Sequence, residues 1–409
     1  MYFRRTFFLP LLLSLAPATG WALGIRIPDQ NPAATARGDA FAATADNPSA
    51  IYYNPAGITQ LDGTRALVGA YAITLKDRVS LDSGEHSSFS STNTDFQFAP
   101  QSYLTWKPPQ SPLALGFGIY APFGFALHYP DDTPIRTLAH IGKIEYLTMN
   151  PVMALKVTRS FSIAIGATIN YGKATLERGV LAPGDRFRFV GDGVGYGLNA
   201  GVLWNPHRMH HFGLSYRAPN EIDFDGHTHL QYDGFTVPTP FGPFPVPGVD
   251  RREEADATIK FPQTLVFGYA FTPTDDWNFE FDLDWADWDS LNTVTLHQKS
   301  GDVLLPFNWR SSFMFEFGVT KKFAYGLHAS AGYVYSENSV PNESFNPIVP
   351  DSNRHIFSVG LGQQFTSLSW DLAYQYTYGP GRRIEQGTAA DGTYRFDSHA
   401  VTLSIGYHF

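Results

Sequence analysis

The chain ends in the stretch AVTLSIGYHF, residues 400–409, and this stretch decides the fold class. Its apolar side chains stand at 401, 403, 405, 407 and 409, while Thr, Ser, Gly and His stand between them. Successive side chains of an extended strand point to opposite faces. The stretch therefore reads as a strand with one apolar and one polar face.

The same alternation recurs upstream in more aromatic segments. Large apolar residues alternate with polar or small ones over 368–378, and Trp, Phe and Leu alternate with Asn, Glu and Asp over 277–286. A soluble β-sandwich also has one apolar face. Here, however, the apolar faces are uniformly large and end in aromatic residues, over roughly the ten positions that a tilted strand of a membrane barrel needs.

We count fourteen such segments, and an even number suits a bacterial outer-membrane barrel. Their connections alternate in length, with short turns on one side and long loops such as 128–142, 177–189, 230–253 and 337–352 on the other. Short turns belong on the periplasmic side and long loops outside the cell. The expected strands are 65–77, 95–107, 112–127, 143–157, 160–176, 190–205, 209–229, 254–272, 275–290, 305–322, 324–336, 353–366, 367–379 and 394–409.

The first 22 residues have the composition of a secretory signal peptide. Arg4 and Arg5 precede an apolar run, and small residues follow at Gly20 and Ala22. The run is too short to span a bilayer, so we expect removal of 1–22 rather than a membrane anchor. Later in the chain no run of about 18 apolar residues offers a transmembrane helix.

Charge and cysteine content narrow the function further. Removal of two arginines and no acid takes the formal charge from -9 to -11, which argues against nucleic acid as a partner. The chain has 0 Cys, which excludes disulfides, thiolate metal sites and cysteine nucleophiles. A secreted chain of this kind fits the Gram-negative envelope.

Residues 23–64 do not show the barrel period. They contain apolar residues at helix-like intervals, and Asn47-Pro48 and Asn54-Pro55 fix two corners of the backbone. A disordered leader is one interpretation; we favour a small helical or irregular hatch that plugs the lumen. The expected organisation is a signal peptide (1–22), a hatch (23–64) and a 14-stranded antiparallel transmembrane β-barrel (65–409), an all-β fold.

These features together resemble the FadL family of outer-membrane transporters for long-chain fatty acids and other hydrophobic compounds. The resemblance covers the whole mature chain: the start GIRIPDQNPAATARGDAFAATADNPSAIYYNPAGIT, the strand count and the terminal Phe409. Its most specific part is Asn54, Pro55 and Ala56, which match the family's NPA motif in the hatch. The resemblance implies capture of substrate at the outer surface and exit toward the lipid through a kinked third strand. One branch of the family carries aromatic hydrocarbons, and this chain resembles both branches.

The third strand independently predicts a break in the wall. Proline removes a donor from the hydrogen-bond ladder, so inside a closed barrel it belongs at a bulge or gap. An ordinary bulge near the outer rim is the alternative to a lateral gate. The gate residues we expect are Gly116, Gly118, Pro122 and Gly124, with Asn54–Ala56 of the hatch lying against them.

Two other strand faces are expected to line the lumen. Glycines at 191, 193, 195, 197 and 201 leave room there and lack the Lys-Ser/Thr of a nucleotide-binding loop. Charges would be costly toward lipid and should pair with each other or with Arg37 and Asp39 of the hatch. Glu280 and Asp282 as an acid pair for hydrolysis are the less favoured interpretation. The charges assigned inward are Lys260, Glu280, Asp282, Asp284, Arg310, Glu316 and Asp371.

The long loops and the hatch supply candidate substrate contacts. Phe235, Phe241 and Phe244 lie among prolines in a rigid apolar loop. Phe187 lies between Arg186 and Arg188, which would receive a carboxylate or, alternatively, a lipopolysaccharide phosphate. In the family the first hatch residues touch the substrate, which makes Arg26 a further candidate.

The resulting hypothesis is a passive uptake channel in the outer membrane, with no cofactor, metal or enzymatic activity. We expect a monomer whose partners are hydrophobic small molecules, outer-membrane lipid and lipopolysaccharide. The histidines of HRMHH, 207–211, lack a supporting carboxylate for a metal site. An aromatic-hydrocarbon transporter, a general diffusion pore and an outer-membrane hydrolase are the alternatives.

Overall fold

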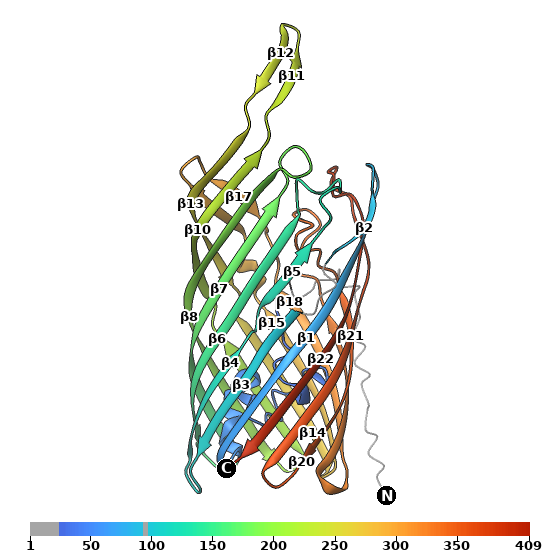
Figure 1. The fold of residues 1–409 in the computed structure, drawn as a ribbon. Coiled ribbons are helices and arrows are strands. Elements are labelled where there is room, and N and C mark those ends of the chain that lie inside the picture. Colours follow the sequence, from blue (N-terminus) through green and yellow to red (C-terminus); the bar gives the residue numbers. More distant parts are fainter. Residues whose placement is uncertain (1–23, 93–96) are drawn as a thin grey trace, which may run out of the picture.

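The computed structural model describes residues 24–92 and 97–409, so the expected signal peptide lies outside the described residues. The described strands form a closed antiparallel barrel of fourteen wall strands, which confirms the predicted count (Figure 1). The wall strands, in order around the barrel, are β1 (Gly63–Leu81), β3 (Gln97–Lys107), β4 (Leu113–Tyr120) with β5 (Gly124–His128), β6 (Ile141–Lys156), β7 (Phe161–Arg178), β8 (Arg186–His207), β9 (His210–Arg217) with β10 (Asn220–Tyr232), β13 (Val249–Phe261) with β14 (Thr264–Thr274), β15 (Trp277–Ala286) with β16 (Thr293–Gln298), β17 (Val303–Pro306) with β18 (Ser312–Lys322), β19 (Leu327–Ser336), β20 (Arg354–Gln364), β21 (Leu368–Ile384) and β22 (Gly392–His408).

The barrel closes where the first strand meets the last. Strand β1 pairs with β22 from Arg65↔His408 to Leu81↔Gly392, and with β3 on its other edge. The structure confirms the period-two pattern in β22. The side chains of Val401, Leu403 and Ile405 face the lipid side and are 42–51% exposed, while those of Thr402 and Ser404 face the lumen and are 1% exposed. Closure satisfies the backbone hydrogen bonds between neighbouring strands around the barrel, except at one interruption in the third wall strand.

Short turns lie at the end of the barrel that carries the C-terminus, and longer segments lie at the other end (Figure 1). One difference from the sequence prediction is the segment 230–253. There β10 and β13 continue far above the other strands as a ribbon that ends in β11 (Phe235–Thr239) and β12 (Gly242–Val246). At the same end β2 (Ser88–Ser90) pairs with the upper part of β1.

In the upper part of the seventh and eighth wall strands the pattern is reversed. The side chains of Ile222, Phe224 and Phe261 are buried in the lumen, and the charged residues between them face outward. Lys260 has a side chain 55% exposed and an Nζ 3.0 Å from Glu221 Oε1, so its inward assignment was wrong. That assignment assumed lipid outside the whole strand, but this part stands above the lipid band, where an outward charge meets a polar medium.

Arg310 also departs from its expected place. It lies between β17 and β18 rather than on the lumen face of a strand. Its side chain is 49% exposed, with Nη2 3.8 Å from Glu343 Oε2. A segment that leaves the wall no longer follows the strand alternation, so periodicity could not place this side chain.

The hatch lies inside the barrel (Figure 1). It consists of α1 (Pro32–Thr35), α2 (Ala50–Tyr53) and the 3₁₀ helix η1 (Pro55–Gln60). Two Asn-Pro pairs begin helices: Asn31 Oδ1 accepts from Ala33 N, and Asn54 Oδ1 accepts from Ala56 N. Two further 3₁₀ turns, η2 (Trp288–Ser290) and η3 (Ala324–Gly326), belong to the wall. Within the described residues, no helix has the length and apolar character that crossing a membrane requires.

Candidate functional site: the hatch and the break in the third strand

The predicted break in the third wall strand is present. Strand β4 ends at Tyr120 and β5 begins at Gly124, and between them the chain turns inward so that Phe123 is buried. The ladder from β3 to β4 stops at Ser102↔Ile119. Above it, among the described residues, β3 pairs with β1 and β5 pairs with β6, but no ladder joins β3 to β5. The wall therefore has a gap between 97–101 and β5.

The N-terminal segment of the hatch takes the place of β3 as a backbone partner at this bend. Ile27 N donates to Pro122 O at 2.8 Å, and Gly124 N donates to Ile25 O at 2.9 Å. The Gln30 side chain donates to Ala121 O at 3.0 Å and accepts from Ala121 N at 3.1 Å. Because buried backbone groups need partners, the inward bend depends on residues 25–30 remaining in place.

Arg26 lies at this junction and is fully engaged. It forms a β-bridge with Phe123, and its guanidinium binds both carboxylate oxygens of Asp284 at 2.7 Å. Both side chains are less than a tenth exposed. A bidentate pair of this kind is among the strongest polar contacts in proteins, so in this conformation Arg26 is not available to a substrate carboxylate.

The lumen face of β15 forms an acceptor ladder for the hatch. Asp282 Oδ2 accepts from the backbone N–H groups of Phe41 (2.9 Å) and Ala42 (2.7 Å). Glu280 Oε1 accepts from those of Ala43 (2.7 Å) and Thr44 (3.0 Å). These contacts confirm the predicted pairing with the hatch for Glu280 and Asp282, whose carboxylates accept from hatch N–H groups instead of facing an open site.

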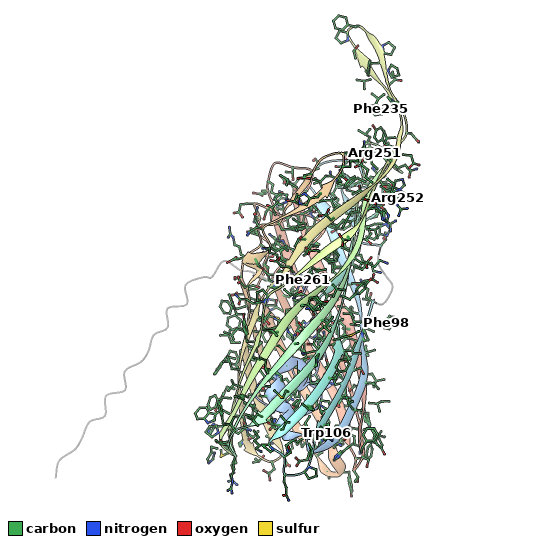
Figure 2. All side chains as sticks on the ribbon, turned by 90° about the vertical axis from the view of Figure 1, so that its left-hand side faces the viewer. Phe98, Trp106, Phe235, Arg251, Arg252 and Phe261 are labelled. Atoms are coloured by element: carbon green, nitrogen blue, oxygen red, sulfur yellow. The ribbon has the colours of Figure 1, made fainter. Side chains whose placement is uncertain are left out.

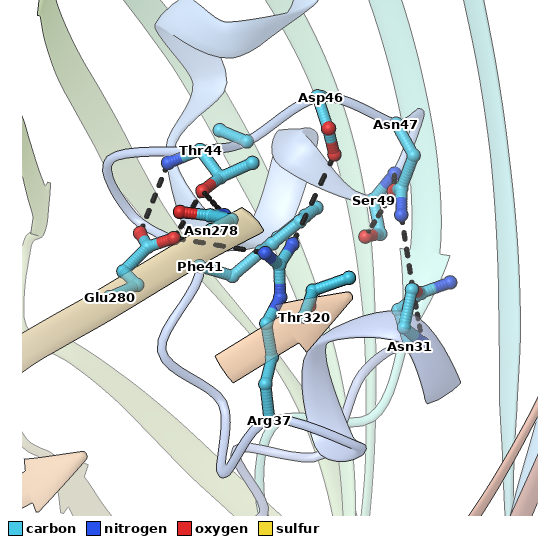
Figure 3. A network of polar contacts seen from close by, with 12 residues as sticks. Asn31, Arg37, Phe41, Thr44, Asp46, Asn47, Ser49, Asn278, Glu280 and Thr320 are labelled. Carbon is cyan, nitrogen blue, oxygen red and sulfur yellow. Dashed lines mark hydrogen bonds and ion pairs between the residues drawn. The ribbon is translucent and has the colours of Figure 1, made fainter. Parts of the chain in front are cut away.

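Arg37 joins the hatch to the same ladder (Figure 3). Its Nη1 lies 3.9 Å from Glu280 Oε2, its Nη2 lies 4.0 Å from Asp46 Oδ1, and its guanidinium stacks on the ring of Phe41. Asp39, the other hatch residue expected to pair with the wall, instead accepts a hydrogen bond from Tyr53 Oη at 2.9 Å within the hatch. Strand β15 is therefore one of the wall strands to which polar contacts hold the hatch.

The NPA motif lies elsewhere than predicted. Asn54 Nδ2 donates to Val202 O on β8 at 2.9 Å and to Ala42 O at 2.7 Å. A Cβ on Gly201 of β8 would come within 2.3 Å of Asn54 Oδ1. The motif thus packs on the glycine face of β8, and the expected contact with the third-strand break is wrong: Gly116 and Gly118 face Ile51 instead. The small wall residue that the motif requires is on a different strand.

We expect Asn54→Ala to loosen the hatch without unfolding the barrel. The substitution removes a hydrogen-bond partner from the carbonyls of Ala42 and Val202 and from the N–H of Ala56. Each buried group left unsatisfied costs about 1–3 kcal/mol. Hydrogen exchange of residues 41–57 should accelerate at least tenfold. Gln60→Ala is the matched control, because the Gln60 amide also donates to two hatch carbonyls but from an exposed position. Equal exchange in both variants would contradict the role assigned to Asn54.

An aromatic cluster packs on the inner side of the bend. Phe123 lies 6.0 Å from Trp288, which lies 4.9 Å from Trp309 (ring centroids). Gly24 has φ +61° and sits so close to these rings that a Cβ would lie 2.4 Å from Trp309 Cζ3. Its N–H donates to Asp351 Oδ2 at 2.9 Å. The cluster connects the start of the hatch to both the bend and the inward turn η2.

Two cavities lie on the extracellular side of the hatch and share Ile348. The deep cavity, of about 140 Å³, reaches from residues 24–29 to Gln97 and Phe125 at the edge of the gap. The outer cavity, of about 60 Å³, is lined mostly by apolar side chains, among them Phe187, Phe189 and Leu305. A larger cavity of about 560 Å³ lies on the other side of the hatch, with polar and charged lining residues such as Arg37, Asp46 and Lys322.

Polar contacts between two extracellular loops lie close to the outer cavity. Arg136 donates to Asp131 and to Asp185 O, and Gly184 N donates to Asp131 Oδ2 at 2.7 Å. Partial burial raises the pKa of the Asp131 carboxyl, but the hydrogen bonds from Arg136 and Gly184 outweigh it and leave that pKa below its ordinary value. Asp131 is therefore ionised at neutral pH and keeps the two loops together.

Comparison with known proteins agrees with this architecture. A family model described as an outer membrane protein transport protein (OMPP1/FadL/TodX) matches residues 13–409. The chain belongs to this family. The protein is therefore located in the outer membrane.

Relatives of this FadL-family chain align over nine-tenths or more of its length at low identity. The long-chain fatty acid transport protein of Escherichia coli strain CFT073 is 21% identical and aligns over 98% of this chain and 97% of its own. Outer membrane protein P1 of Haemophilus influenzae is 20% identical over 90% and 91%. A Pseudomonas aeruginosa FadL homologue superposes with a TM-score of 0.80 at 19% identity, over 95% of this chain and 100% of its own. The Pseudomonas putida toluene transporter TodX superposes with a TM-score of 0.72 at 16% identity, over 95% of this chain and 98% of its own. At such identities the structural likeness concerns the fold.

The predicted substrate contacts of this FadL-family channel do not come together in one place. Phe187 lines the outer cavity. Its neighbour Arg186 donates from Nη2 to Gln231 Oε1 at 3.0 Å, and Arg188 Nε lies 3.7 Å from Glu177 Oε2. Phe235, Phe241 and Phe244 instead lie on the ribbon that projects above the barrel, where Figure 2 labels Phe235. Their part in capture stays a prediction.

Several residues of the path were not found from the sequence. The segment 337–352, expected to be an external loop, folds into the mouth of the barrel and buries Val340, Phe345 and Ile348. Its apolar residues among prolines were the available signal. A Cβ on Gly142 of β6 would lie 2.5 Å from Ile348, so the opposite wall is shaped to receive this segment. Within residues 24–92 and 97–409, no group of three or more metal-ligating side chains is assembled.

Proposed function

We propose that this chain is a passive channel for hydrophobic compounds, which captures them at the extracellular mouth and releases them laterally through the gap at the third strand. The single observation that carries the proposal is the deep cavity, which ends at the gap between 97–101 and β5. Long-chain fatty acids and aromatic hydrocarbons, the compounds named for its relatives, are the two substrate classes considered. An enzymatic role finds no support in the engaged carboxylates.

The route from the mouth to the gap begins in an apolar cavity and ends beside the apolar residues Phe125 and Leu127. The outer cavity offers Phe187, Leu305 and other apolar side chains to a ligand arriving from water. Ile348 belongs to both cavities, so a short movement of this side chain joins them. Because transfer of apolar surface out of water is favourable at each step, the path needs no energy source beyond the substrate gradient.

The exit favours the bilayer over the periplasm. The cavity beyond the hatch is lined by charged and amide side chains, such as Arg37, Asp46 and Asn47, that an apolar molecule would have to desolvate. The gap at the third strand instead opens beside outward apolar residues such as Phe98. Figure 2 shows Phe98 and Trp106 pointing away from the wall along this edge.

The charges of the deep cavity bear on the substrate class. Its ionisable lining residues are three aspartates and two arginines. Arg26 is held by Asp284, and Arg354 Nη2 lies 2.6 Å from Asp351 Oδ1. A fatty-acid carboxylate would therefore have to displace an existing ion pair, whereas a hydrocarbon would not. This observation favours the aromatic-hydrocarbon alternative in the closed conformation.

Uptake by a strain that lacks this chain tests the function directly. With the chain restored, we expect faster uptake of radiolabelled toluene, oleate or both, and no small-ion conductance typical of an open pore in planar bilayers. Uptake equal to that of the deletion strain for both compounds would overturn the proposal. A large steady conductance would favour the general diffusion pore.

We expect Phe187→Ser to impair capture without affecting release. Loss of the aromatic surface removes about 1.5–3 kcal/mol of favourable burial. The substrate concentration for half-maximal uptake should rise about tenfold or more, at an unchanged maximal rate. Phe244→Ser on the projecting ribbon is the comparison. A similar rise there would assign capture to the ribbon, and an unchanged Phe187→Ser variant would remove the outer cavity from the path.

A further inference from the structure

A compact group of basic residues lies on the outward face of β1 and β22. Lys76 faces Asp397 and Arg78 faces Arg395 in the antiparallel register. The alternating neighbours, including Asp77 and Val79, are buried toward the lumen, so these charged side chains point away from the barrel. We refer to Lys76, Arg78 and Arg395 as the basic cluster.

Among the described residues, the basic cluster has more positive charge than the facing carboxylates neutralise. Asp397 is the carboxylate within it and forms an ion pair with Arg78. Arg395 stands directly opposite Arg78 and, among the described residues, has no ion pair with a carboxylate. Like charges placed directly opposite on neighbouring strands repel each other. A bound anion would relieve this repulsion.

The height of the basic cluster on the wall indicates where such an anion comes from. Tyr378, 48% exposed, is the partner of Asp397 on β21. Just below, Tyr374 Oη lies 2.7 Å from His399 Nδ1, and the outward residues after that are apolar, beginning with Val401. Aromatic residues of this kind mark the interface that bounds the lipid band. The basic cluster is therefore level with the lipid headgroups of the outer leaflet.

We propose that the basic cluster binds the phosphate groups of a phosphorylated saccharide lipid of the outer leaflet, the chemistry of lipopolysaccharide. Two guanidinium groups side by side can each offer a pair of N–H donors to phosphate oxygens. The acyl chains of the same lipid would then lie along the apolar face below, over Val401 and Leu403. A free phosphate ion satisfies the arginines but gains nothing from that face.

The opposite side of the barrel provides an internal contrast. Asp225 faces both Asp192 and Asp256 across neighbouring strands, which makes a row of three outward carboxylates. Between the two sides, on β6 and β7, Lys143 Nζ lies 2.7 Å from Glu145, and Lys173 faces Glu145 and Asp192. The lysines at that position are compensated by acids, whereas among the described residues the basic cluster has Asp397 as its one facing carboxylate.

The test compares two paired substitutions in the purified full-length barrel. Arg78→Gln with Arg395→Gln removes the uncompensated charges, and Lys143→Gln with Lys173→Gln removes the same number from the compensated site. Binding of bisphosphorylated lipid A in detergent is measured by native mass spectrometry. Each basic residue near a headgroup contributes about fivefold in affinity. We expect about thirtyfold weaker binding in the first pair and less than about threefold in the second.

Further arms separate phosphate recognition from a structural effect. Lipid A stripped of its phosphates should bind the native chain about as weakly as the Arg78→Gln/Arg395→Gln variant binds intact lipid A. Arg78→Lys with Arg395→Lys should retain most of the affinity, and Arg395→Gln alone should cost about fivefold; this single variant replaces the pair if the pair fails to fold. Equal weakening in both pairs, equal binding of stripped lipid, or competition by inorganic phosphate at the concentration at which lipid A itself binds would overturn the proposal.

Discussion

Uptake through this channel should stop when the gap in the third strand is bridged, and should return when the bridge is broken. Gln97 on β3 and Ala126 on β5 face each other across the gap, where Gln97 Nε2 donates to Ala126 O at 3.2 Å. With cysteine at both positions, a short thiol-specific cross-link replaces the missing ladder with a covalent tie. Because lateral release needs these two edges to separate, we expect uptake to fall to the level of a strain without the channel.

The chain is suited to this experiment because it has 0 Cys, so no other thiol reacts. A cysteine pair at Ser102 and Ile119, the last paired positions of β3 and β4, is the matched control on an edge that a regular ladder already joins. Uptake should be insensitive to that cross-link, and a reducing agent should restore the Gln97–Ala126 variant when the bridge is a disulfide. Full uptake by the cross-linked gap variant would place the exit elsewhere.

The second large effect is expected at the acceptor ladder of β15. Glu280→Gln with Asp282→Asn should release the hatch and turn a closed barrel into a conducting one. Neutral amides weaken the hydrogen bonds that the four backbone N–H groups of hatch residues 41–44 donate to these two side chains. Hydrogen bonds to charged groups contribute about 1.5–3 kcal/mol each. A total loss of about 3 kcal/mol raises the population of displaced hatch about a hundredfold.

Single-channel recording in planar bilayers measures this opening. Glu254→Gln with Asp256→Asn has the same residue types at the same spacing, but on the exposed outward face of β13, and should leave the conductance unchanged. Heat-modifiable migration in both double variants shows that the barrel itself has folded. If the ladder variant stays closed, contacts such as Arg26 with Asp284 suffice to hold the hatch.

Features that depend on neighbouring residues in the chain could be predicted from the sequence, whereas features that depend on distant residues could not. Strand number, most strand boundaries and the break near Pro122 followed from alternation and from the chemistry of proline, but the continuation of the ninth wall strand to Gln298 was missed. The outward turn of Lys260 was missed because a charge pattern does not say where the lipid band ends. The position of the NPA motif was missed because two strands, β4 and β8, both offered a run of glycines.

By itself the sequence determined a barrel, an interior plug and a weak point in the wall, because each depends on the order of neighbouring residues along the chain. The tertiary structure decided which parts meet. Phe41 and Asp282, which are hydrogen-bonded, are 241 positions apart in the sequence. Asn54 packs on β8 because Gly201 has no side chain and leaves room for the Asn54 amide. Such contacts depend on the closed register of the whole wall, which no short stretch of sequence contains.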